Sequence, residues 1–263
     1  MADIRFVQAD TLKEKPADVS KVGFGRVFTD YMFEMDYNPE EGWHDARIVP
    51  YQDVPLSPAN ATLHYGQAIF EGCKAYRYEG GKAVVFRAKD HIARLNRSAK
   101  ILDIPEVDEK LVYDALMKLI DLEKDWIPDG PGQSLYIRPF IFSTDPYLGV
   151  SVGQYYKMMI ILSPVGAYYA NGFAPVKIMV EDTYVRAPKG GLGAAKTPAN
   201  YAASLHGGLI AHEKGYDQTL WTDGIEHKYI GEVGSMNILF KIDGKVVTPE
   251  LDGTILDGIT RRT

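Results

Sequence analysis

The chain has 263 residues, 46% of them hydrophobic and 24% charged, which is ordinary for a folded globular protein and excludes a mainly disordered chain. A formal net charge of −6 at pH 7, without a basic stripe, argues against a nucleic-acid-binding protein. The single cysteine excludes an internal disulfide and fits a reducing compartment, and no apolar run is long enough to cross a membrane. The six histidines have no metal-ligand spacing. We therefore expect a cytoplasmic protein without a membrane partner or a bound metal.

The N-terminal part of the chain alternates between strand and helix patterns. Residues 1–20 are polar and without periodicity, so we expect a loosely ordered arm there. Apolar residues at helical spacing predict one helix capped by Asp90 and a second from Asp108 to about Trp126. Strands are expected at residues 24–37, 46–51, 75–78, 82–86, 134–143 and 156–162, with a hairpin turn at residues 79–81.

A run rich in glycine and other turn-forming residues at 164–173 predicts a linker between two α/β domains. The smaller N-terminal domain then comprises residues 1–163, and the second domain comprises residues 174–263. In the second domain, a helix is predicted behind Thr197 and Pro198. Short strands are expected at residues 176–180, 219–222, 228–230, 235–242 and 245–248.

The stretch Lys189-Gly190-Gly191-Leu192-Gly193-Ala194-Ala195-Lys196 is the most informative part of the sequence. Glycine permits tight backbone and the close approach of a ligand. Since a helix begins directly afterwards, Lys196 is predicted on a loop at the mouth of that helix. Its small neighbours leave room for a flat ligand.

Three interpretations of Lys196 are open on this stretch alone. A phosphate-binding loop is disfavoured, because Ala195 replaces the second glycine of that pattern and the lead-in to Pro188 is polar where a buried strand is needed. A lysine with a lowered pKa in a roomy pocket could form a Schiff base with a carbonyl cofactor. An ordinary solvated lysine is at least as common. Other positions are needed to decide between the last two.

Three further residues fit a pyridine-type cofactor bound through Lys196. Tyr201 lies about one helical turn further on, so its hydroxyl can reach the same pocket. Glu232, between glycines and apolar runs, is a candidate partner for a ring nitrogen, and a buried carboxylate there needs a cationic or protonated neighbour. Arg94, on the helix near Asp90, is a candidate for binding the phosphate of such a cofactor.

Further motifs follow one another in a specific order. They are His64-Tyr65-Gly66 with Phe70-Glu71-Gly72, His91-x-x-Arg94-Leu95, Tyr136-Ile137-Arg138-Pro139, Leu148-Gly149-Val150, Lys189-Gly190-Gly191 with Lys196 and Asn200-Tyr201, and Glu232-Val233-Gly234-Ser235-Met236-Asn237. In this order the sequence, from about Phe24 onward, resembles the branched-chain-amino-acid aminotransferases of the fold-type IV pyridoxal-phosphate enzymes. The resemblance implies a two-domain α/β fold with the cofactor at the domain interface.

The resemblance also implies a role for each matching residue. Lys196 would bond covalently to pyridoxal 5'-phosphate and transfer the proton, Glu232 would pair with the ring nitrogen, and Tyr201 would donate to the phenolic oxygen. Arg94 and the backbone of Ile259 and Thr260 would hold the phosphate. The implied substrate-binding residues are Phe24, Tyr65, Phe70, Tyr136, Arg138, Tyr168 and Ser235, with Arg138 accepting the distal carboxylate of glutamate, and Leu148 and Val150 reaching the neighbour's site in a homodimer.

The implied reaction is ping-pong transamination of leucine, isoleucine and valine with 2-oxoglutarate, which gives branched 2-oxo acids and L-glutamate. Transaminases of D-amino acids or amines and aminodeoxychorismate lyase, which share the fold, remain alternatives. A phosphate-loop nucleotide-binding protein and a non-catalytic paralogue are alternatives from other classes. The family's chain continues past Thr263 with a phosphate-binding turn, so we expect the PLP-binding domain to be incomplete at its C-terminal end.

Overall fold

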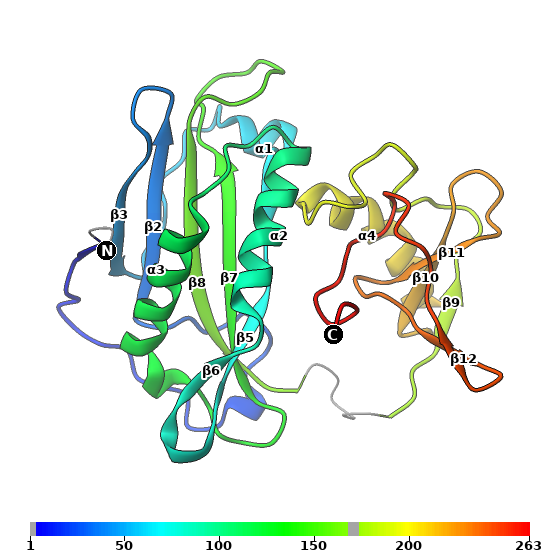
Figure 1. The fold of residues 1–263 in the computed structure, drawn as a ribbon, viewed down its shortest axis with the longest axis horizontal. Helices are drawn as coiled ribbons and strands as arrows, with labels where there is room; N and C mark the ends of the chain where they lie inside the picture. The colour runs from blue at the N-terminus through cyan, green and yellow to red at the C-terminus, as the bar shows by residue number, and fades with distance from the viewer. Residues whose placement is uncertain (1–3, 168–173) are drawn as a thin grey trace. The chain divides into compact units, whose positions relative to one another are not determined.

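The computed structural model describes residues 4–167 and 174–263, and the chain divides into two compact units, Met1–Phe173 and Ala174–Thr263 (Figure 1). The division falls at the end of the predicted linker. The predicted start of that linker at residue 164 is corrected by the structure, because strand β8 includes Pro164 and ends at Val165. Backbone pairing with β7 continues to that residue, so punctuating residues alone did not end the strand.

The first unit contains, among the described residues, an eight-stranded sheet with the order β1-β3-β2-β8-β7-β5-β6, in which β4 also pairs with β7. All its pairings are antiparallel except that of β1 with β3. The strands are β1 (Arg5–Phe6), β2 (Tyr31–Asn38), β3 (Gly42–Pro50), β4 (Ala68–Phe70), β5 (Cys73–Arg77), β6 (Ala83–Val85), β7 (Ser134–Ser143) and β8 (Tyr156–Val165).

Helices α2 and α3 lie along one face of this sheet (Figure 1). Asp108 caps α3 by accepting hydrogen bonds from the backbone of Lys110 at 2.8 Å and of Leu111 at 2.9 Å, as its position in the sequence predicts. The helical segments of the unit are α1 (Ala61–Tyr65), α2 (Ala88–Ile101) and α3 (Glu109–Leu122), with 3-10 turns at Val19–Lys21, Glu79–Gly81 and Lys124–Trp126.

The main hydrophobic core lies between the sheet and these two helices. Alternate residues of β2, such as Phe33 and Met35, point into it and are 0% exposed. The helices contribute apolar residues at helical spacing, including Leu95 and Leu116. The core therefore fixes which side chains of each strand face away from the helices.

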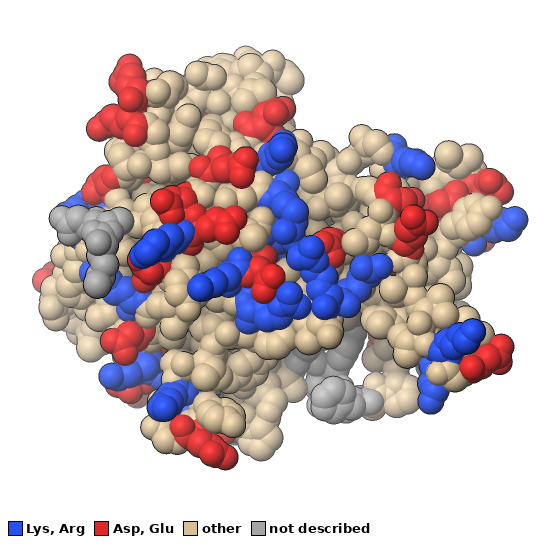
Figure 2. All heavy atoms as spheres, viewed as in Figure 1, with Lys and Arg blue, Asp and Glu red and all other residues tan. Residues whose placement is uncertain are grey.

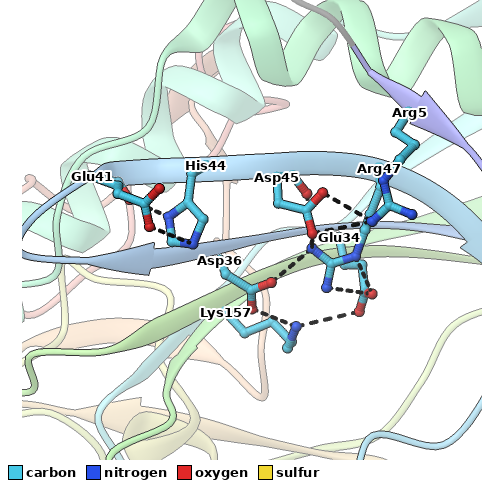
Figure 3. Close-up of polar contacts among 9 residues, drawn as sticks. Arg5, Glu34, Asp36, Glu41, His44, Asp45, Arg47 and Lys157 are labelled. Carbon is cyan, nitrogen blue, oxygen red and sulfur yellow. Dashed lines mark hydrogen bonds and ion pairs between the residues drawn. The ribbon is translucent and has the colours of Figure 1, made fainter.

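The face of the sheet opposite this core carries a charge network that crosses three strands (Figure 3). Arg47 on β3 donates to Glu34 at 2.8 Å and to Asp36 at 2.8 Å, both on β2, and Lys157 on β8 donates to Asp36 at 2.6 Å. Burial alone would raise the pKa of the Asp36 carboxyl, but the hydrogen bonds from Lys157 and Arg47 lower it below its usual range. Strand register thus places opposite charges against one another, which satisfies partly buried carboxylates.

Two expectations for the N-terminal region are corrected. Residues 4–6 do not form a loose arm, because Arg5–Phe6 pairs with β3 and Ile4 is buried. The strand expected from residue 24 begins only at Tyr31. Gly25 has a left-handed φ of 65°, which interrupts an extended chain.

The second unit is a smaller α/β assembly with short strands. β10 pairs with β11 in the antiparallel sense and with β9 in parallel, while β12 and β13 form a separate hairpin. Helix α4 begins at Pro198, as predicted. Its elements are β9 (Ile178–Val180), α4 (Pro198–Glu213), β10 (Gln218–Thr222), β11 (Ile230–Val233), β12 (Phe240–Ile242) and β13 (Lys245–Val247).

Acidic and basic side chains lie among one another on the face shown in Figure 2. A group of basic side chains on this face has acidic neighbours beside it.

Within residues 4–167 and 174–263, none of the helices combines the length and apolar character that crossing a bilayer requires.

Glu123 follows α3 directly in the chain, and its buried carboxyl group contacts the first residue of β2. It is 2% exposed and accepts a hydrogen bond from the backbone N–H of Tyr31. Burial, helped by the nearby Asp30 and opposed by the bond from Tyr31, raises the pKa of Glu123 to about 7. The folded state therefore binds the Glu123 proton more tightly than the unfolded state, whose carboxyl has a pKa near 4.5.

This difference predicts that Glu123 stabilises the fold fully below pH ~4.5 and that this contribution is lost as the pH rises to about 7. Glu123→Gln keeps the shape and removes the titration. Urea unfolding at a series of pH values should show the free energy of unfolding of the wild type falling, relative to the variant, by on the order of 3 kcal/mol between pH 4.5 and 8. Asp125→Asn, at an exposed carboxyl two residues further on, is the control and should follow the wild type. If the unfolding free energies of wild type and Glu123→Gln changed in parallel with pH, the assignment would be wrong.

Candidate functional site

The predicted site residues fall into two groups, one within each unit. The described residues of the first unit hold Phe24, Tyr65, Phe70, Arg94, Tyr136, Arg138, Leu148 and Val150, and the second unit holds Lys196, Tyr201, Glu232, Ser235, Ile259 and Thr260. Tyr168 lies outside the described residues.

The loop that carries Lys196 is held by the helix that follows it. The side-chain amide of Asn200, in the first turn of α4, donates to the carbonyl oxygens of Leu192 at 2.8 Å and of Ala195 at 2.9 Å. These bonds satisfy backbone acceptors in the loop and fix the residue before Lys196. The preceding strand, β9, ends at Val180, well before Gly190, so the strand-to-loop arrangement of a phosphate-binding loop is not present.

Gly193 lets this loop pack against the segment near residue 254. A Cβ atom at Gly193 would lie 2.3 Å from the carbonyl oxygen and 2.5 Å from the Cα atom of Thr254. Any side chain at this position would therefore push the two backbones apart. The lack of a side chain at Gly193 therefore serves a contact within the protein.

Lys196 and Tyr201 face each other across the start of α4. The Lys196 Nζ atom donates a hydrogen bond to the Tyr201 hydroxyl at 2.7 Å, and both side chains are half-buried. The five-residue spacing thus places both groups on one side of the helix start, as the sequence predicts. An amine and a phenol in contact can hold and pass a proton.

Glu232, on β11, is 4% exposed and has the cationic neighbour that burial requires. Its Oε2 atom lies 2.6 Å from the Arg186 Nη2 atom, and its Oε1 atom accepts from the Asn237 amide at 2.8 Å. Arg186 also donates to the carbonyl oxygen of Thr254 at 2.7 Å. The carboxylate is therefore held from two sides.

Asn237 connects Glu232 to the segment that was predicted to bind phosphate. Its amide also donates to the Leu256 carbonyl oxygen at 2.9 Å, and a Cβ atom at Gly258 would lie 1.9 Å from the Asn237 Oδ1 atom. In the following turn Ile259 is buried and Thr260 is exposed. Ser235 is exposed on the short turn between Glu232 and Asn237.

In the first unit, Arg94 on α2 belongs to a buried charge cluster. Its Nε and Nη2 atoms donate to Glu71 at 2.7 and 2.9 Å, and His91 lies 2.8 Å from the same carboxylate. Burial alone would raise the pKa of Glu71, but the hydrogen bonds from His91 and Arg94 hold it below the ordinary value. Glu71 therefore sets the orientation of the Arg94 guanidinium.

Arg138 lies among aromatic rings on β7 and β4. Its guanidinium carbon is 4.4 Å from the centre of the Phe70 ring, and its Nη2 atom donates to the Tyr136 hydroxyl at 2.8 Å. The Nε atom is buried without a hydrogen-bond partner among the described residues. Phe24 packs edge-on against Tyr136, with 4.8 Å between ring centres. A cation with an unsatisfied donor beside apolar rings fits a ligand with an apolar body and an acidic end.

The remaining predicted residues of the first unit are on the surface. Tyr65 ends the short helix α1 and is 45% exposed. Leu148 and Val150 lie on the connection between β7 and β8 and are 66% and 86% exposed. Large apolar side chains at such exposure are available for contact with another molecule.

The contributors that were not singled out from the sequence include Glu71, Arg186, Asn200 and Asn237. Glu71 and Asn200 stand inside the motifs that carry the resemblance, but their partners depend on tertiary packing. For Arg186, the requirement that a buried Glu232 needs a cation is a signal, although it does not say which of the many basic residues supplies it. No group of three or more potential metal-ligating side chains occurs in the part of the chain that the structure describes.

Comparison with known proteins decides the family. The model of the family "Amino-transferase class IV" matches residues 68–263. The chain belongs to this family. "Branched-chain-amino-acid aminotransferase 2" of Bacillus subtilis (strain 168) is 55% identical over 260 residues, which are 99% of this chain and 71% of that protein.

Solved class IV aminotransferases share the fold. The branched-chain amino acid aminotransferase from Escherichia coli is 30% identical with a TM-score of 0.69, covering 89% of this chain and 70% of that one. The T.th. branched-chain amino acid aminotransferase with pyridoxamine 5'-phosphate is 26% identical with a TM-score of 0.70, covering 88% of this chain and 71% of that one. The expected fold-type IV α/β architecture is thereby confirmed.

The packing at Gly193 predicts a local and severe effect of one methyl group. Gly193→Ala should destabilise the protein by about 1–3 kcal/mol, because the Cβ atom overlaps the Thr254 backbone. Gly208→Ala, in α4 with open space around its Cβ position, should be neutral or stabilise by about 0.5–1 kcal/mol. Urea unfolding of both variants measures the difference, and equal stability would contradict the described contact.

Proposed function

We propose that this class IV aminotransferase transfers the amino group of branched-chain L-amino acids to 2-oxoglutarate, using pyridoxal 5'-phosphate. The observation that carries the proposal lies within one compact unit, where Lys196 contacts Tyr201 and the carboxylate of Glu232 is buried. The matched family and the printed names of its relatives support the reaction and the substrate class.

The residues present fit the cofactor. The second unit supplies a primary amine beside a phenol, a buried carboxylate, and a loop whose neighbours are small. In the first unit, Arg94 supplies a buried guanidinium suited to a phosphate. When bound, pyridoxal phosphate supplies an aldehyde that bonds to amines and a ring that accepts electrons from the substrate's alpha carbon.

The protein's own residues then perform binding and proton transfer. Lys196 holds the cofactor through its amine and, once released, takes and returns the proton at the alpha carbon. Tyr201 orients that amine through the 2.7 Å hydrogen bond. Glu232 stabilises positive charge at the ring nitrogen, while Arg94 and the backbone at Ile259 and Thr260 hold the phosphate.

The substrate pocket serves two kinds of side chain. Phe24, Phe70 and Tyr136 supply apolar surface for leucine-like side chains. Burying such a side chain contributes about 1.5–3 kcal/mol of favourable free energy. Arg138, assisted by Tyr65 and Tyr136, accepts the distal carboxylate of glutamate. Tyr168 and Ser235 complete the proposed set.

We further propose that the enzyme is a cytoplasmic homodimer. The exposed side chains of Leu148 and Val150 then reach the site of the neighbouring subunit. Single, buried and unpaired Cys73 agrees with a reducing compartment.

Lys196→Ala tests the chemistry directly. The variant should lose the visible absorbance of bound cofactor and all transamination of leucine with 2-oxoglutarate, because no amine remains to bond the aldehyde. Lys189→Ala, on the same loop, should keep both. Absorbance spectra and a coupled glutamate assay provide the measurements, and a coloured, active Lys196→Ala variant would refute the assignment.

Arg138→Leu tests the division of the substrate pocket. The kcat/KM for glutamate should fall by about 100-fold, because its carboxylate loses a charge-assisted partner. The value for leucine should stay within about threefold, because the apolar walls remain. Arg138→Lys, which keeps the charge, should lie between. Equal losses for both substrates in Arg138→Leu would contradict the assignment.

A further inference from the structure

The carboxylate of Glu232 has two neighbours that no assignment above uses. Arg186 contacts one oxygen at 2.6 Å and Asn237 donates to the other at 2.8 Å. A carboxylate has about four acceptor positions on its two oxygens, so it can accept several donors at once. The side chains of Arg186 and Glu232 are only 10% and 5% exposed, so water screens their attraction weakly.

Arg186 is fixed independently of Glu232. The same Nη2 atom donates to the Thr254 carbonyl oxygen at 2.7 Å, and the Thr254 backbone packs directly against Gly193 in the Lys196 loop. The segment at Thr254 therefore contacts both Arg186 and the lysine loop. The guanidinium is held by backbone and does not need a ligand to order it.

A fixed positive charge at this place decides where a shared proton lies. When a ring nitrogen forms a hydrogen bond with Glu232, the shared proton has two possible positions. On the nitrogen it leaves a cationic ring and a carboxylate, and on the carboxyl group it leaves a neutral ring. Arg186 is in direct contact with the carboxylate oxygen, and Coulomb energy falls with distance. The guanidinium thus stabilises the carboxylate more than it disfavours a cationic ring beyond it.

Building on the proposed function, we infer that Arg186 is a positioning residue that keeps Glu232 ionised and thereby keeps the ring nitrogen of the cofactor protonated. Asn237 fixes the second oxygen of the same carboxylate and leaves the charge unchanged. Arg186 acts through Glu232 and needs no contact with substrate. Its effect is on the electron-accepting strength of the ring, which depends on protonation of that nitrogen.

The inference assigns the effect of Arg186 to its positive charge and not to its hydrogen bonds. Two variants of Arg186 separate these contributions. Arg186→Gln keeps an N–H donor and removes the charge, while Arg186→Lys keeps the charge and removes the fork of donors. Lys228→Met is the matched control, because Lys228 lines the same hollow as Arg186 and Glu232 but is exposed. None of these changes removes Lys196 or Glu232.

The test is the ¹⁵N chemical shift of the ring nitrogen in protein loaded with ¹⁵N-labelled pyridoxal phosphate. Wild type, Arg186→Lys and Lys228→Met should show the protonated shift, and Arg186→Gln should move more than halfway toward the unprotonated value. A protonated shift in Arg186→Gln, or an unprotonated one in Arg186→Lys, overturns the inference. Failure of the wild type to bind the cofactor through Lys196 would instead refute the proposed function.

A second measurement applies if Arg186→Gln does not fold. The ¹³C shift of the Glu232 carboxyl, assigned by comparison with Glu232→Gln, reports its ionisation in the loaded wild type and in Arg186→Lys. The inference requires an ionised carboxylate in both proteins. A protonated Glu232 carboxyl in either would overturn it.

Discussion

The buried pair of Glu232 and Arg186 is the constraint on which the second unit depends. A carboxylate that is 4% exposed is tolerated only with a close cation and further hydrogen bonds. Arg186 and Asn237 supply these, and the Thr254 carbonyl oxygen in turn accepts a hydrogen bond from Arg186. The strands of this unit are short and form few backbone hydrogen bonds. Polar side-chain contacts such as these therefore help to hold its loops in place. Gly193 then packs the lysine loop against Thr254, and Asn200 ties that loop to the start of α4.

In the first unit, a large sheet positions the candidate site residues. One face packs on α2 and α3, and β7 carries Tyr136 and Arg138 on the other face because side chains alternate along a strand. Charged side chains on that second face are matched across β2, β3 and β8 by register (Figure 3). The buried cluster of Glu71, His91 and Arg94 orients a guanidinium by the same principle of full satisfaction.

Local signals predicted several elements that periodicity and caps define, although Asp90 does not cap α2, which already begins at Ala88. The sequence indicated β7 with its observed ends, the start of α4 behind Thr197, and the helix after Asp108, because each depends on residues close in the chain. The strand expected from Phe24 begins only at Tyr31, because Gly25 adopts a left-handed φ of 65° that interrupts an extended chain. The apolar stripe of α4 predicted the helix but not its environment, since Leu205 and Leu209 are 71% and 54% exposed.

The sequence supplied candidate site residues where a motif carried them, but it did not supply partners that depend on packing. The contact of Tyr201 with Lys196 follows from their five-residue spacing, whereas Arg186 as the neighbour of Glu232 requires the fold. The central claim is that Lys196 is the lysine that bonds the cofactor. Borohydride reduction of the loaded protein followed by peptide mapping tests it most directly. The pyridoxyl group should be found on the peptide that contains Lys196, and its attachment to any other lysine, or to none, would contradict the account.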